Sequence, residues 1–339
     1  MTVTQKSWGK TPAGEEVRFL TLKNSTGFRA QISTYGASLT ALEILLDGKK
    51  TDVVLGFDSL RGYLTDGTYS GATVGRVAGR ISNAQFKISG QEFKLDRNEG
   101  RNHLHGGDKG FNSRNWEVRA INQDEHAPSV TLSLHSPDGS NGYPGNLLAE
   151  TTFTLNKTAL IISYRATTDQ PTPLSMTAHP YFNLNGDGKP VNDHELKIFS
   201  AQCTALGSNL IPDGRIINIS GTEADSMDFS PLGKTALDCF FILEKDNEKL
   251  VPAAVARGDD SGLEMEIHTS QPGMQFYTAE GIAPGTPGKY GQKYGPRSGF
   301  CIEPMGYPDA VNRPEFPSVI LHPGETYNHS TEYRFRRVS

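Results

Sequence analysis

The sequence predicts an all-β protein, built as a large antiparallel β-sandwich or barrel. Alternating or β-branched runs of five to nine residues recur between turns rich in Gly, Pro, Asn and Asp. The 339 residues include 36 Gly and 20 Pro, which disfavour helix interiors by about 1 and 3 kcal/mol each. No segment longer than about ten residues carries an apolar stripe of helical period. We therefore do not expect a helical bundle, a coiled coil or a helical repeat protein.

The expected strands follow one another at short spacing, as in an antiparallel sheet protein. Two hairpins are predicted, one across Ser89-Gly90-Gln91 and one across Asn156-Lys157-Thr158. A short helical turn is expected near Ser59–Tyr63, and the absence of a fixed-period repeat disfavours a propeller. The predicted strands are Val17–Leu22, Phe28–Thr34, Ser38–Leu46, Phe86–Ser89, Phe93–Leu95, Trp116–Ile121, Ser129–Leu134, Thr151–Leu155, Leu160–Thr167, Leu263–Thr269, Met274–Thr278, Phe300–Glu303, Val319–Leu321 and Thr326–Phe335.

The composition predicts a single domain over residues 1–339, because no linker or charge block divides the chain. The net charge of −5 gives no basic surface for a nucleic acid. No apolar run reaches the ~18 residues of a membrane span, and residues 1–17 lack a secretion signal. Three widely spaced cysteines argue against a disulfide framework and favour the cytoplasm. A monomer and a homodimer are both compatible with the sequence.

The segment Asn102 to Gly107 holds the first candidate groups, His103 and His105. The two glycines that follow permit a turn and leave free space beside the second imidazole. The plain alternative is a loop with two surface histidines. A metal site of cupin type is a further alternative, because residues two apart share a strand face. We expect no metal, because no Glu follows closely and Gly106-Gly107 ends the strand.

A second candidate, His179, ends an extended run and is followed by Pro180, which favours β or polyproline geometry before it. Tyr181 and Phe182 would then supply an aromatic wall on which a sugar ring can stack. The alternative is a histidine at the edge of the core that caps a loop.

A third candidate, Glu303, lies in an apolar strand. Strand alternation places Phe300 and Ile302 on one face, and Cys301 and Glu303 on the other. A carboxylate in such a run is costly unless it is paired, exposed or used in chemistry. The alternative is a solvent-facing position at the strand end.

Three further charged residues, Arg76, Arg80 and Asp238, lie in apolar or glycine-rich segments. Taken singly, each is most simply explained as a surface ion-pair partner. None of them carries a functional prediction on its own.

Together, these segments resemble the aldose 1-epimerase (galactose mutarotase) family, and the resemblance runs in order along almost the whole chain. Each motif is weak alone, but the set in register is highly specific. The motifs are Tyr35-Gly36-Ala37, Val54-Leu55-Gly56-Phe57, Gly75 to Ile81, Asn102 to Gly107, Ser136 to Gly145, His179 to Leu184, Leu237 to Phe240, Cys301-Ile302-Glu303 and Pro308-Asp309-Ala310.

The resemblance implies a galactose mutarotase-like β-supersandwich without a cofactor. By position, His105 and His179 match the two active-site histidines of the family, and Glu303 matches its catalytic carboxylate. Asp238 matches a sugar-binding aspartate and Arg80 a sugar-contacting arginine. Tyr181 is expected to bind substrate as well.

The implied activity is that of an isomerase that interconverts the α and β anomers of free hexoses such as galactose or glucose. Ring opening needs a base at the anomeric hydroxyl and an acid at the ring oxygen, and closure reverses the two roles. We expect Glu303 to be the base and His179 the acid. His105 would hold the ring-oxygen region or share charge, and Asp238 and Arg80 would clamp hydroxyl groups.

Two alternatives stay open at this point. A hexose-6-phosphate 1-epimerase would use the same acid–base pair with a phosphate pocket, to which Arg76, Arg97 and Arg101 could contribute. A non-catalytic carbohydrate-binding or regulatory module of the same fold would bind sugar without turnover. The preferred aldose is also open, because four positions depart from the family pattern beside presumed sugar contacts, namely Gly79, Ala178, Glu280 and Met305.

Overall fold

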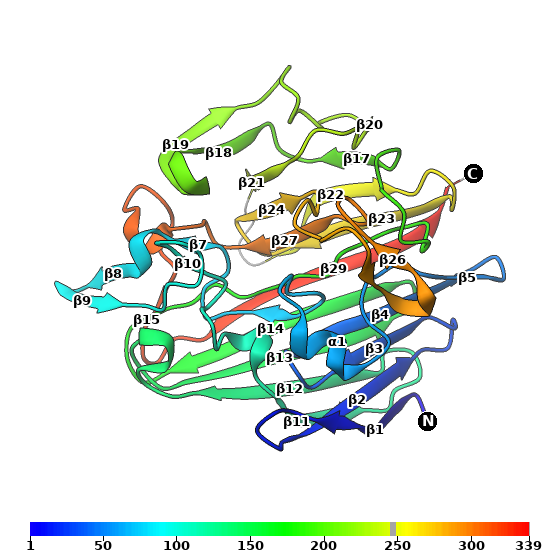
Figure 1. Ribbon diagram of the computed structural model, residues 1–339, viewed down its shortest axis with the longest axis horizontal. Helices are drawn as coiled ribbons and strands as arrows, with labels where there is room; N and C mark the ends of the chain where they lie inside the picture. Colours follow the sequence, from blue (N-terminus) through cyan, green and yellow to red (C-terminus); the bar gives the residue numbers. More distant parts are fainter. Residues whose placement is uncertain (245–248, 339) are drawn as a thin grey trace.

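The computed structural model describes residues 1–244 and 249–338, and it confirms the predicted all-β class. Strands dominate (Figure 1), and α1 (Leu60–Thr65) is the one α-helix in the described part of the chain, where a helical turn is expected. In the described ranges no helix is long and apolar enough to cross a membrane.

The molecule contains three larger sheets, and neighbouring strands within each of them are antiparallel. The first is a five-stranded meander with the order β1-β2-β3-β4-β5. Its strands are β1 (Val3–Lys10), β2 (Glu16–Lys23), β3 (Arg29–Ser33), β4 (Ser38–Leu46) and β5 (Lys49–Asp52).

The second sheet has nine strands in the order β11-β12-β13-β14-β29-β23-β22-β17-β20. It joins distant parts of the chain, because the C-terminal strand β29 pairs with both β14 and β23. Its strands are β11 (Glu117–Asn122), β12 (Ser129–Ser136), β13 (Leu147–Asn156), β14 (Ala159–Thr168), β29 (Tyr327–Arg337), β23 (Leu263–Thr269), β22 (Val251–Arg257), β17 (Glu195–Ile198) and β20 (Ser230–Pro231).

The third sheet has five strands in the order β19-β18-β21-β24-β27, and five two-stranded pairs complete the fold. The sheet contains β19 (Pro212–Asn218), β18 (Gln202–Leu206), β21 (Asp238–Ile242), β24 (Gly273–Tyr277) and β27 (Cys301–Met305). The pairs are β6 (Thr73–Val74) with β16 (Thr177–Ala178), β7 (Arg80–Ile81) with β10 (His103–Leu104), β8 (Gln85–Ile88) with β9 (Gln91–Lys94), β15 (Thr172–Pro173) with β28 (Ile320–Leu321), and β25 (Thr286–Pro287) with β26 (Lys293–Tyr294).

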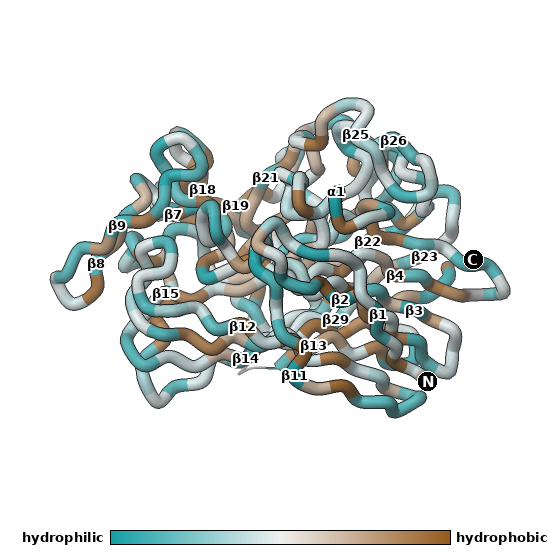
Figure 2. Tube along the Cα trace, turned by 60° about the horizontal axis from the view of Figure 1, so that its bottom comes forward, coloured by the Kyte–Doolittle hydropathy of each residue, from teal (hydrophilic) through white to brown (hydrophobic). Residues whose placement is uncertain are grey.

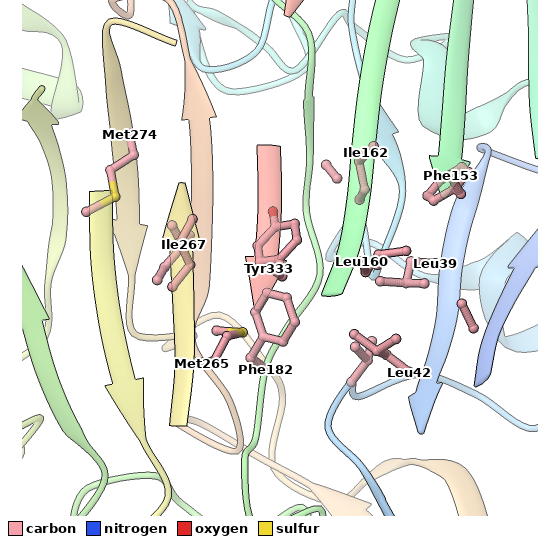
Figure 3. Packing of buried hydrophobic residues seen from close by; sticks show 14 of the residues in the cluster. Leu39, Leu42, Phe153, Leu160, Ile162, Phe182, Met265, Ile267, Met274 and Tyr333 are labelled. Atoms are coloured by element: carbon pink, nitrogen blue, oxygen red, sulfur yellow. The ribbon is translucent and has the colours of Figure 1, made fainter. Parts of the chain in front are cut away.

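One continuous hydrophobic cluster joins the three larger sheets, which makes the molecule a sandwich. Figure 3 shows Leu39 and Leu42 of β4 beside Leu160 and Ile162 of β14, in the layer between the first two sheets. Hydrophobic residues recur along the strands and hydrophilic residues along most loops (Figure 2). Each fully buried Leu or Ile stabilises the fold by about 1.5–3 kcal/mol.

The predicted strands and both predicted hairpins are present, with bounds that differ by a few residues. The region 195–257 is the main difference, because β17 to β22 were not predicted there. In β22, Pro252 lies at an irregularity of the register. β17 and β20 are short, so too few residues alternate to give a signal.

Candidate active site

The six residues predicted for the site all line one cavity of about 350 Å³, within the ~300–1,000 Å³ typical of small-ligand pockets. They come from β7, β21, β27 and the segments that follow β10 and β16. The remaining wall is largely apolar and includes Leu104, Leu206, Leu210, Pro212, Phe240, Met305 and Pro308.

Glu303 lies on β27 and points into this cavity, while Phe300 and Ile302 pack in the hydrophobic core. The alternation expected for this strand is confirmed, and the solvent-facing alternative is wrong because Glu303 is 2% exposed. Burial and the nearby Asp238 raise the pKa of the Glu303 carboxyl well above its usual value, and Arg80 opposes this increase. Its Oε2 atom has no hydrogen-bond partner among the described residues. The carboxyl is therefore available to a ligand.

His179 directly follows β16, which pairs with β6 and places the imidazole at a strand end, as predicted. Its Nε2 lies 3.5 Å from Oε1 of Glu303. Its Nδ1 lies 3.5 Å from Sγ of Cys301. Burial lowers the pKa of His179 to about 4, so the imidazole is neutral at pH 7 in the absence of a ligand.

His105 follows β10 at a left-handed turn with φ of +53°. The next residue, Gly106, has φ of +90°, and a Cβ there would lie 1.8 Å from the carbonyl oxygen of Gly75. The backbone N–H of Gly79 donates to Nδ1 of His105 at 3.2 Å. Because Nδ1 accepts this bond, the neutral ring carries its proton on Nε2. Burial, followed by the charges of His179 and Arg80, holds the pKa of His105 well below its usual value. His105 therefore offers a neutral N–H donor.

His103 has a structural role instead. Its Nδ1 lies 2.8 Å from the carbonyl oxygen of Asp96, and its Nε2 lies 2.8 Å from the hydroxyl of Tyr143. Both ring nitrogens are occupied, so the alternative in which His103 and His105 share a metal is wrong.

A different trio has the spacing of a metal site. One ligand atom each from His105, His179 and Glu303 lie within 4.8 Å of one another, and all three residues are buried. A metal-bound histidine donates its second ring N–H to a neighbour, whereas Nδ1 of His105 accepts the Gly79 N–H. Its Nε2 thus keeps a proton, and the trio suits an organic ligand better than a metal ion. The absence of a metal or cofactor stays a prediction.

Arg80 and Asp238 are ion-paired, but on the wall of the cavity rather than on open surface. The Arg80 guanidinium donates two hydrogen bonds to Oε1 of Glu99, from Nε at 2.9 Å and from Nη2 at 2.7 Å. Its Nη1 lies 3.6 Å from Oδ2 of Asp238, whose Oδ1 accepts a hydrogen bond from Gln275 at 2.5 Å. This chain of polar groups presents donors and acceptors of the kind that bind hydroxyls.

The aromatic wall differs in part from the prediction. Tyr181 lines the cavity, but its hydroxyl donates to the carbonyl oxygen of Thr68, so its ring is what meets a ligand. Phe182 is buried in the core beside Phe300 and Tyr333, and its predicted place in the wall is wrong.

The sequence prediction missed Tyr69, Gln275 and Glu99. Tyr69 lines the cavity with φ of +59°, and its ring lies 4.7 Å from that of His105 and 5.9 Å from that of His179. Gln275 is the β24 residue paired directly with Glu303. Strand register would have revealed Gln275, but the sequence does not give the register of distant strands.

Two of the four departures from the family pattern, Gly79 and Met305, line the cavity. The other two do not, contrary to expectation. Ala178 pairs with Thr73 in the β16–β6 ladder, and Glu280 forms an ion pair with Arg297.

The arginines suggested for a phosphate pocket lie elsewhere. Arg76 is buried and donates to Ser136 and Thr172, together with the carbonyl oxygens of Pro137, Pro144 and Gly145. Arg97 and Arg101 are exposed and do not line the cavity.

A buried carboxyl and two imidazoles share a ligand-sized cavity of an antiparallel sandwich, an arrangement typical of β-sandwich enzymes that use acid–base chemistry. The sequence model described as aldose 1-epimerase matches residues 18–334. The chain therefore belongs to the aldose 1-epimerase family, whose members are isomerases.

Named relatives match over nearly their whole length. The chain is 41% identical to the galactose mutarotase of Bos taurus, covering 99% of each chain, and 40% identical to that of Homo sapiens, covering 98% of each. It is 33% identical to the aldose 1-epimerase of Escherichia coli, covering 96% of each. The solved structure of an aldose epimerase homologue from C. elegans superposes with a TM-score of 0.87 at 30% identity, covering 95% of this chain and 99% of that one. The expected galactose mutarotase-like fold is thereby confirmed.

Proposed function

We propose that this protein catalyses the interconversion of the α and β anomers of free aldoses, with galactose and glucose as candidate substrates. Its membership of the aldose 1-epimerase family supports the activity. One observation carries the proposed mechanism. A ring nitrogen of His179, a ring nitrogen of His105 and a carboxylate oxygen of Glu303 lie within 4.8 Å of one another in a ligand-sized cavity.

The proposed reaction opens and recloses the sugar ring. The Glu303 carboxylate takes the proton of the anomeric hydroxyl, and Nε2–H of protonated His179 gives a proton to the ring oxygen. The bond between the anomeric carbon and the ring oxygen breaks, and the anomeric carbon becomes an aldehyde. Rotation about the first carbon–carbon bond presents the other face, and the two groups reverse their roles. General acid–base assistance of this kind contributes about 10²–10⁴-fold for each group.

Glu303 and His179 share one proton between them in the proposed mechanism. Without a ligand, burial favours a protonated Glu303 and a neutral His179. The reactive form has the same number of protons, with one moved across the 3.5 Å between Oε1 and Nε2. The positive charge of Arg80 favours the ionised carboxylate. The neutral Nε2–H of His105 would steady the ring oxygen as negative charge develops there.

Substrate hydroxyls would be held by Asp238, Arg80 and Gln275, and the sugar ring by Tyr181 and Tyr69. A buried hydroxyl without a partner costs about 1–3 kcal/mol, which makes such clamps selective. The phosphorylated-sugar alternative is not favoured, because Arg80 is the sole Lys or Arg among the described residues of the cavity wall and is already paired with Glu99.

Polarimetry tests the proposal. The optical rotation of freshly dissolved α-galactose should relax faster in proportion to added protein, with a far smaller effect on galactose 6-phosphate. Calorimetric binding of galactose without faster relaxation would favour the non-catalytic sugar-binding module instead.

We also propose a metabolic role and a location in the cell. An anomer-exchanging enzyme would serve galactose and hexose metabolism, and the cysteine usage supports a cytoplasmic location. The number of subunits, one or two, stays a prediction.

A further inference from the structure

Strand β27 touches both nitrogens of the His179 imidazole. Cys301 and Glu303 are two residues apart on one face, and both are buried. A strand rises about 3.3–3.4 Å per residue, so the two side chains leave room for one flat ring between them. Sγ of Cys301 lies 3.5 Å from Nδ1, and Oε1 of Glu303 lies 3.5 Å from Nε2. The mechanism above uses Glu303 and leaves Cys301 without a role.

We propose that Cys301 is a positioning residue for His179, whose Nδ1–H donates to the Cys301 sulfur, so that Nε2 is kept as the nitrogen that exchanges the proton. This inference rests on the proposed anomer exchange, in which His179 alternates between acid and base.

The position of the ring proton decides whether His179 can alternate. A neutral imidazole has one N–H and one bare nitrogen. If the proton sits on Nδ1, Nε2 accepts a proton to form imidazolium and then gives it to the ring oxygen, which regenerates the neutral ring. If Nδ1 is bare, the proton sits on Nε2, and giving it away would leave an imidazolate. A hydrogen-bond acceptor beside Nδ1 therefore selects the working tautomer.

The surroundings of Cys301 suit an acceptor of this kind. Burial, assisted by the charges of Glu303 and Asp238, raises the pKa of the Cys301 thiol well above its usual value, so the sulfur stays uncharged. A carboxylate in its place would stabilise imidazolium and raise the pKa of His179.

The two imidazoles of the site are thus held in opposite tautomers. Nδ1 of His105 faces a donor, the Gly79 N–H, which fixes its proton on Nε2. Nδ1 of His179 faces the Cys301 sulfur, which frees its Nε2. His105 is then a constant donor and His179 the group that cycles. The other titratable groups around His179 are Glu303, His105, Tyr69, Tyr181 and Asp66.

Nitrogen-15 NMR of the histidine-labelled full-length protein tests this assignment at pH 7. The wild type should show His179, assigned by comparison with His179→Asn, as a neutral ring with the proton on Nδ1. In Cys301→Ala the proton should redistribute toward Nε2, whereas Cys301→Ser should retain the wild-type pattern because a hydroxyl oxygen also accepts. Cys203→Ala is the matched control, because it removes a buried thiol from β18 and should leave the signal unchanged.

Polarimetry gives the second readout. Cys301→Ala should lower kcat about 10-fold, the low end of the loss seen when the partner that orients a metal-bound histidine is removed, with KM within about twofold. Cys301→Ser should recover most of this loss. A bare Nδ1 in the wild type, or wild-type kcat in Cys301→Ala, would overturn the proposal. The NMR result on the wild type needs no activity, and the only variant it needs is His179→Asn, which assigns the signal. An inactive wild type with Nδ1 protonated would refute the anomer exchange but not the tautomer assignment.

Discussion

Glu303 combines deep burial with an oxygen that has no partner among the described residues. An unsatisfied buried polar group costs about 1–3 kcal/mol, so this residue weakens the fold in the absence of a ligand. His179 shows the same conflict, because burial opposes the charge that it must carry as an acid. Glu303 and His179, which the proposed chemistry needs, therefore lower the stability of the folded state.

Glu303→Gln should lower kcat about 10²–10⁴-fold, because the amide cannot take the anomeric proton. Its free energy of unfolding should stay level or rise, because the amide needs neither a buried charge nor the uptake of a proton on folding. Polarimetry and urea unfolding measure the two effects. Glu43→Gln is the matched control. It removes a buried carboxylate of β4 that pairs with Arg29 and Lys50, so it should cost about 1 kcal/mol of stability and leave kcat unchanged. Near-full activity of Glu303→Gln would remove Glu303 from the base role.

The low pKa of His179 makes stability depend on pH. The folded state binds this proton more weakly than the unfolded state, so the contribution is complete above pH 6.5 and is lost as pH falls through about 4. A pKa that falls from 6.5 to about 4 corresponds to about 3 kcal/mol. His179→Asn should therefore lose less stability than the wild type between pH 7 and pH 4, as measured by urea unfolding at several pH values. Parallel curves for the two proteins would contradict the burial of a neutral imidazole.

At the scale of the elements, the alternation of apolar and polar residues predicts strands well where the run is long and only one face of the strand is buried. β13 and β14 are ten-residue strands with alternating burial, and both were predicted with their turn. β1 is mostly exposed and polar, and β22 contains Pro252 among small residues, so neither gives a clear period. In these strands, pairing with distant neighbours decides the structure instead of local pattern.

The site was predictable only in part, for a related reason. The resemblance identified Glu303, His179 and His105, which occur in separate segments that the sequence alone does not bring together. Tyr69 and Gln275 join them through a left-handed backbone position and through strand register. Both depend on the folded chain, so the sequence prediction missed them.

The turn after β10 offers a test at this scale. Gly106→Ala should destabilise the protein by about 3 kcal/mol, because the left-handed backbone is unfavourable for Ala and the new Cβ would overlap the Gly75 carbonyl. Displacement of His105 should also lower kcat. Gly90→Ala is the control, at the tip of the β8–β9 hairpin, where φ is also positive but a Cβ meets open space. It should cost only about 1 kcal/mol and keep full activity. Equal losses in the two variants would contradict this explanation of the turn.

At the scale of the whole molecule, one core connects the sheets that build the site. Its cluster includes Leu42 of the first sheet, Ile162 of the second and Ile302 of the third. Ile302 lies between Cys301 and Glu303 on β27, so the strand that carries the proposed chemistry is anchored in this common core. The cavity can therefore hold a fixed geometry although its residues come from distant segments.

A single domain over residues 1–339 stays a prediction, and calorimetry tests it. A shared core should unfold in one cooperative transition, with equal calorimetric and van't Hoff enthalpies. Galactose should raise the midpoint, because it binds the folded state alone. Two resolved transitions, of which galactose moves only one, would show separate units.

The most direct measurement is a crystal structure of the Glu303→Gln variant with bound galactose, since this variant should bind sugar without exchanging its anomers. We expect the anomeric oxygen within ~3 Å of the side chain at position 303 and the ring oxygen at the same distance from Nε2 of His179. Other hydroxyls should meet Asp238 and Arg80. A sugar whose anomeric carbon points away from position 303 and both imidazoles would contradict the proposed mechanism.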